Sequence, residues 1–99
     1  MNICCLVSLA AKAQNDAYLA LDRCAGFFVE ASAAGRELIG SPQAVLVVFY
    51  GLRAHRTRQE LRLARKGIAS AFPSRDSKLV RQWSHADSKV LARMRCLGL

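Results

Sequence analysis

Apolar residues recur at helical spacing through the last quarter of the chain. Positions three or four apart lie on the same face of an α-helix, so this spacing predicts an amphipathic helix after Pro73. Ser74 or Asp76 is expected to cap the start of that helix. The residues that share the apolar face are Leu79, Trp83, Ala86, Val90, Met94 and Leu97.

The first forty residues predict two further helices. One covers Ile3 to about Cys24, where leucine and alanine recur near helical spacing, and the other covers Phe27 to Ile39. Gly26 is the expected break between them, because glycine often ends a helix.

The middle of the chain contains the clearest local signal. Gly40 can end one helix, Ser41 can cap the next, and Pro42 suits a first helical position, so a helix is expected from Pro42 to Phe72. Its β-branched beginning leaves an alternative open, namely a buried strand at 44–50. The sequence therefore predicts a single helical domain over 1–99, an all-α bundle of three or four helices, with an α+β fold as the alternative.

Charge is distributed unevenly along the 99 residues. The net charge is +8, yet residues 1–50 sum to −1 and residues 51–99 sum to +9. This asymmetry points to nucleic acid, an acidic membrane surface or an acidic protein as a partner. Arginine outnumbers lysine eleven to four, which suits phosphate contacts but also follows from a GC-rich gene.

The excess charge is concentrated between residues 53 and 66. On a helix, one side of this segment is apolar and the adjoining side is basic, with like charges three or four residues apart. Such neighbours repel each other, so an external anion is expected to balance them. The predicted phosphate-binding residues are Arg58, Arg62, Arg65 and Lys66, with Arg53 and Arg56 beside them.

Duplex or structured RNA or DNA is the expected partner. The stretch between Gly51 and Ala71 contains no aromatic residue on which single-stranded bases could stack. Gln59 is the only amide there, so little sequence preference is expected. Three alternatives stay open: an ordinary solvated face, a peripheral membrane or protein-interaction module that uses the same faces, and a chain without an evolved function. In the membrane alternative, Val45 to Tyr50 inserts at the membrane interface.

Other chemistry is weakly represented. The cysteines form no zinc-binding motif, the histidines lie in no catalytic motif, and no glycine-rich phosphate loop is present, so we expect no enzyme, no metal, no cofactor and no small-molecule substrate. Reduced thiols indicate a cytoplasmic or nuclear protein rather than a secreted one. Acylation of Cys4 and Cys5 is an open alternative.

Self-association is also expected. A core of three helices in so short a chain is predicted to leave part of the last apolar face uncovered. A homodimer would double the basic surface and increase the affinity for a polyanion. The predicted oligomer interface consists of Leu79, Trp83, Val90 and Met94.

Overall fold

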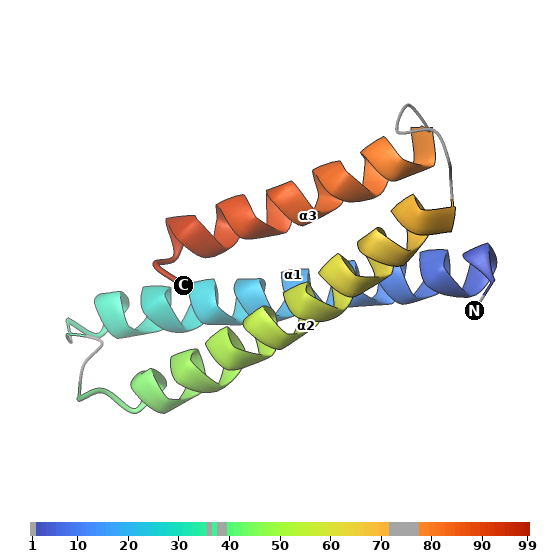
Figure 1. The fold of residues 1–99 in the computed structure, drawn as a ribbon. Helices are drawn as coiled ribbons and strands as arrows, with labels where there is room; N and C mark the ends of the chain where they lie inside the picture. The colour runs from blue at the N-terminus through green and yellow to red at the C-terminus, as the bar shows by residue number, and fades with distance from the viewer. Residues whose placement is uncertain (1, 36, 38–39, 72–77) are drawn as a thin grey trace.

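The computed structural model describes residues 2–35, 37, 40–71 and 78–99, and these residues form three helices and no strand. They are α1 (Ile3–Ala33), α2 (Gln43–Ala71) and α3 (Lys78–Cys96). Figure 1 shows α2 running back along α1, and α3 running back along α2. The predicted all-α fold is confirmed.

α1 is one continuous helix where the sequence predicted two. It begins after Asn2, whose side-chain oxygen accepts a hydrogen bond of 2.9 Å from the backbone N–H of Cys5. Gly26 lies inside the helix and does not break it, because a single glycine costs a helix only about 1 kcal/mol. The helix instead ends before Gly35, which has a φ of +68° that glycine adopts without strain. The predicted end at Ile39 lies outside the described residues.

α2 matches its prediction closely. Gly40 has a φ of +86°, and the helix begins at Gln43, one residue after Pro42. Residues 44–50 are helical, so the alternative strand is wrong. Val47 is buried in the helical conformation, and this packing outweighs the small helix propensity of β-branched residues. The predicted caps of the last helix, Ser74 and Asp76, lie outside the described residues.

Small side chains line the contact between α1 and α2. Alanines from both helices are almost fully buried there, and they surround larger side chains such as Leu21, Leu61 and Ile68. Helix axes approach closely where the intervening side chains are small. The buried alanines of this contact are Ala10, Ala13, Ala17 and Ala20 on α1 and Ala54 and Ala64 on α2.

α3 closes the core with the apolar face that the sequence predicted. Trp83, Val90 and Met94 are buried within the single chain, and Leu79 packs partly buried against the same core. These side chains were predicted to form an oligomer interface. The fold instead uses them inside one molecule, where they cover the α1–α2 pair, so Trp83, Val90 and Met94 are not exposed to a second copy.

Candidate nucleic-acid interface

The six predicted phosphate-binding residues all lie on α2, but the fold divides them among three environments. The division follows from the helical repeat of 3.6 residues, which places residues two positions apart, such as Arg56 and Arg58, on nearly opposite sides of the rod. One pair faces α3, one pair faces solvent, and one pair lies on the side of α2 away from α3.

Arg58 and Arg65 face α3 and share one acidic partner. The Nε atom of Arg58 lies 3.3 Å from Oδ1 of Asp87, and the Nε atom of Arg65 lies 3.6 Å from Oδ2 of the same carboxylate. Asp87 is buried, whereas both arginines are partly exposed. One carboxylate cannot neutralise two guanidinium groups, so this cluster retains a formal charge of +1.

Arg62 and Lys66 are exposed on the neighbouring side of α2. They are four residues apart and therefore lie one above the other on the helix surface, about 6 Å apart along its axis. Within the described part of the chain, neither forms an ion pair. These two residues match the predicted uncompensated charge most closely.

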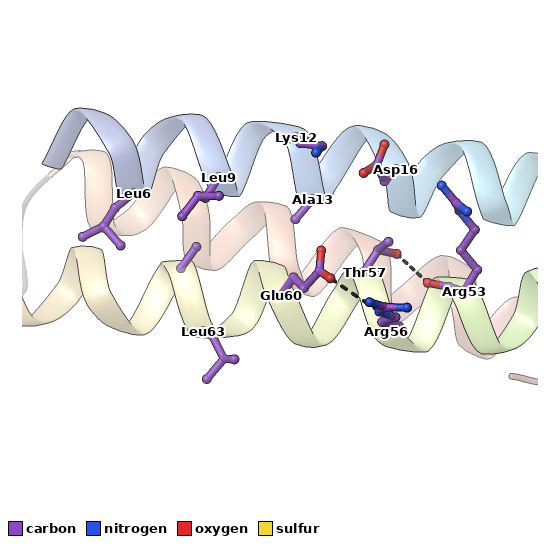
Figure 2. A pocket seen from close by; sticks show the side chains of 11 residues that line it. Leu6, Leu9, Lys12, Ala13, Asp16, Arg53, Arg56, Thr57, Glu60 and Leu63 are labelled. Carbon is purple, nitrogen blue, oxygen red and sulfur yellow. Dashed lines mark hydrogen bonds and ion pairs between the residues drawn. The ribbon is translucent and has the colours of Figure 1, made fainter. Parts of the chain in front are cut away.

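Arg53 and Arg56 lie on the side of α2 away from α3. Both line a groove between α1 and α2, together with Asp16 and Glu60 (Figure 2). Arg56 forms an exposed ion pair of 3.7 Å with Glu60, one helical turn away. The structure therefore does not bring Arg53 and Arg56 together with the other four residues, and acidic neighbours partly balance their charge.

α3 adds two arginines on the solvent side of its contact with α2. Arg81 and Arg95 are exposed on the outward strip of α3, about 120° and about 80° around the helix from Asp87 respectively. Ser84 and Ser88 separate them, and the Ser88 hydroxyl donates a hydrogen bond to the backbone oxygen of Ser84. Short side chains thus leave the space between the two arginines open.

We call this surface the basic seam. Its six cations and single carboxylate leave a formal charge of +5 across the junction of α2 and α3 and the adjoining outer side of each helix. Its members are Arg58, Arg62, Arg65, Lys66, Arg81 and Arg95, with Asp87 beneath them.

The other cations of α3 point elsewhere. Arg93 forms an ion pair with Asp22 of α1, and its guanidinium carbon lies 5.2 Å from the centre of the Tyr18 ring. Lys78 and Lys89 are exposed on the side of α3 nearer α1.

Asp87 is the member of this site that sequence reasoning missed. It follows Trp83 by four residues and precedes Val90 by three, so it falls on the apolar face of α3. An acidic residue at a core-facing position indicates a buried partner of opposite charge. The arginine-rich face of α2 supplies that partner.

Membrane-spanning helices and metal-binding clusters are absent from the described residues. No helix there is both long and apolar enough to cross a membrane. No group of three or more histidine, cysteine or acidic side chains is placed to hold a metal ion in that part of the chain. Comparisons with protein-family models, with curated proteins and with solved structures find no match to the chain.

Proposed function

We propose that this protein binds duplex or structured nucleic acid by contacting backbone phosphates with the basic seam. The observation that carries the proposal is the stacked pair Arg62 and Lys66, which faces solvent beside a cluster in which Asp87 serves two arginines. Repulsion within this surface decreases when an external polyanion binds.

The arrangement suits a phosphate backbone better than it suits an isolated anion. Arginine offers a planar fork of donors that matches phosphate oxygens. A duplex presents one negative charge per about 1.7 Å of its axis, so a seam several helical turns long meets several phosphates at once.

The same arrangement predicts little sequence preference. Reading base edges requires amide or arginine side chains that enter a groove, and Gln59 is the one amide between residues 53 and 66 of α2. Phosphate contacts position a protein on nucleic acid without identifying bases. Affinities for duplexes of unrelated sequence are therefore expected to be similar.

A salt series with a fluorescently labelled duplex tests the proposal. Neutralisation of about five phosphates predicts a slope of log K against log salt concentration of about −4 to −5. Replacing both Arg62 and Lys66 by glutamate should weaken binding and reduce the magnitude of the slope by about 2. Circular dichroism should show unchanged helical content, because both residues are exposed.

A matched control is available on the same molecule. The double variant Lys78→Glu/Lys89→Glu makes the same change in net charge on the side of α3 away from the basic seam. It should retain most of the affinity. Equal losses in the two double variants would show that binding follows total charge, and the assignment to the basic seam would then be abandoned.

One observation favours a second candidate, a peripheral membrane protein. Large apolar side chains near the start of α2 are exposed, and they precede the basic part of the same helix, an arrangement typical of interfacial helices. Flotation with anionic vesicles tests this alternative. Vesicle binding without any duplex binding would replace the first proposal by the second. The exposed side chains are Val45, Val48, Phe49 and Leu52.

A further inference from the structure

The side of the α1–α2 pair that faces away from α3 has a different character from the basic seam. It contains a groove of about 600 Å³ that opens between the two helices, and Figure 2 shows it with the ribbon of α3 behind. Leu9 and Leu63 line this groove although they are 47% and 60% exposed. Apolar side chains that line an open groove gain stability when another surface covers them.

The outer strip of α1 along this groove is self-complementary in the antiparallel direction. Leu9, Lys12, Asp16 and Leu19 follow one another at spacings of three, four and three residues, so they lie on one side of the helix. The first three line the groove, and Leu19 continues the strip beyond it. All but Asp16, which is partly buried, are exposed. The order apolar, cation, anion, apolar is symmetric about position 14. A second copy turned end for end therefore sets Leu9 against Leu19 and Lys12 against Asp16.

α2 repeats this order at the same level of the molecule. Arg53, Glu60 and Leu63 line the groove, and Phe49 lies one turn before Arg53 on the same side of α2. The order is again apolar, cation, anion, apolar, and it is centred near position 56. Asp16 and Ala13 line the groove together with Arg53 and Thr57, so the centres of the two strips lie side by side. A single two-fold axis across both helices therefore satisfies both strips.

We propose that this groove face is the interface of a homodimer, with the two-fold axis crossing α1 near position 14 and α2 near position 56. An isologous interface requires a surface that complements itself, and both strips meet this requirement in apolar contacts and in charge. In the dimer, α1 packs antiparallel on α1 of the second copy, and α2 packs on α2. Leu9 then meets Leu19 of the second copy and Phe49 meets Leu63 of the second copy, and these contacts cover the two facing grooves.

The charge of the groove face argues for a second copy over a polyanion. Its lining contains Lys12, Arg53 and Arg56 but also Asp16 and Glu60, whereas the basic seam carries a single acid. Arg56 lies close to the proposed axis, and its ion pair with Glu60 reduces its repulsion from the symmetric arginine. Because α3 lies on the far side, the dimer leaves both basic seams exposed, and the inference does not depend on nucleic-acid binding.

Sedimentation equilibrium of the full chain tests the dimer. The wild-type protein should self-associate between micromolar and millimolar concentration. Lys12→Glu places acids against acids across the axis, and Asp16→Lys places lysines against lysines, so each variant alone should associate about tenfold more weakly. Circular dichroism of each variant should match the wild type.

Mixing the two variants gives the decisive result. In a heterodimer, the glutamate introduced at position 12 of one chain meets the lysine introduced at position 16 of the other. The unchanged Asp16 of the first chain meets the unchanged Lys12 of the second, so association should recover. The control pair Lys89→Glu and Glu37→Lys makes the same charge changes away from the groove and should self-associate like the wild type. A monomeric wild type, or a mixture that does not recover, would overturn the inference.

Leu19→Glu separates the two proposals. It places a charge in the apolar part of the groove face without touching the basic seam, and the side chain it replaces is 60% exposed. Self-association should be lost. The monomer should still bind duplex through the basic seam, but without the increase in affinity that two linked binding surfaces provide. Self-association equal to that of the wild type would contradict the dimer, whatever the result for nucleic acid.

Discussion

Oδ1 of Asp87 lies 3.3 Å from Nε of Arg58, and this contact joins α3 to α2 beside the apolar core. The second oxygen of the carboxylate lies 3.6 Å from Nε of Arg65, two helical turns farther along α2. Asp87 thus bridges two arginines on the same face of the neighbouring helix, and a shift of α3 by one turn along α2 would break at least one of these pairs. We infer that the bridge helps to set how α3 is aligned on α2.

Asp87→Asn should lower the free energy of unfolding by about 1 to 3 kcal/mol, because it leaves two neighbouring cations without their shared partner. Urea denaturation followed by circular dichroism measures the change. Glu60→Gln is the matched control, since it removes the acid of the exposed pair with Arg56 and should change stability by about 0.5 kcal/mol or less. Equal effects of the two substitutions would contradict a special role for Asp87. If the basic seam binds phosphate, Asp87→Asn should also strengthen duplex binding.

Gly26 and Gly67 are both helical but have different surroundings. A Cβ atom at Gly26 would meet nothing within 4 Å, whereas one at Gly67 would lie 3.0 Å from a terminal carbon of Leu6. Gly26→Ala should therefore stabilise the protein by about 0.5 to 1 kcal/mol through helix propensity. Gly67→Ala should increase stability less, because the Leu6 side chain must move to make room for the new methyl group. A larger gain in Tm at position 67 than at position 26 would contradict this interpretation.

Trp83→Ala distinguishes a core residue from an interface residue. Trp83 is only 5% exposed in the single chain, so its truncation should lower the free energy of unfolding by about 3 to 5 kcal/mol. The loss should appear even at concentrations at which the protein is monomeric. A variant that is as stable as the wild type but unable to self-associate would restore the interface role predicted from the sequence.

The helices could be predicted from the sequence where packing and local chemistry agree. The spacing of Trp83, Val90 and Met94 correctly identified the buried face of α3, and Gly40 with Pro42 located the start of α2 within one residue. Gly26 suggested a break that does not occur. The cost of one glycine to helix stability is small compared with the packing of α1 before and after this residue. Capping and turn residues therefore located the start of a helix better than a single glycine predicted a break within one.

The candidate site was less predictable because it depends on which helix covers which side. The helical repeat places Arg58, Arg62, Arg65 and Lys66 on adjoining positions, but it does not indicate that α3 would supply Asp87 to two of them. Arg53 and Arg56 are close to this group in sequence and lie on another side of the rod. Partners from distant parts of the chain are fixed by tertiary packing, and one helix pattern taken alone does not contain that information.

Cys24 should differ from the other three cysteines in its reactivity. It is buried, and its thiol donates a weak hydrogen bond of 3.6 Å to the backbone oxygen of Val47, whereas Cys4, Cys5 and Cys96 are exposed. Burial raises the pKa of Cys24 above its ordinary value of 9.0, and the thiolate is the reactive form. A colorimetric disulfide reagent at neutral pH should modify three thiols rapidly and the fourth only as the protein unfolds. Rapid reaction of all four would show that the contact between α1 and α2 opens readily at Cys24.

The same burial predicts how stability responds to alkali. Above pH 9 the unfolded chain loses the Cys24 proton while the folded chain still holds it, so the unfolded state binds fewer protons and stability falls as pH rises. Other groups also titrate there, so the informative quantity is the difference between the wild type and Cys24→Ala. Between neutral pH and pH values above 9, the free energy of unfolding should fall more for the wild type than for Cys24→Ala, because alanine has no proton to lose. A difference that stays constant over this range would show that the folded and unfolded thiols ionise alike.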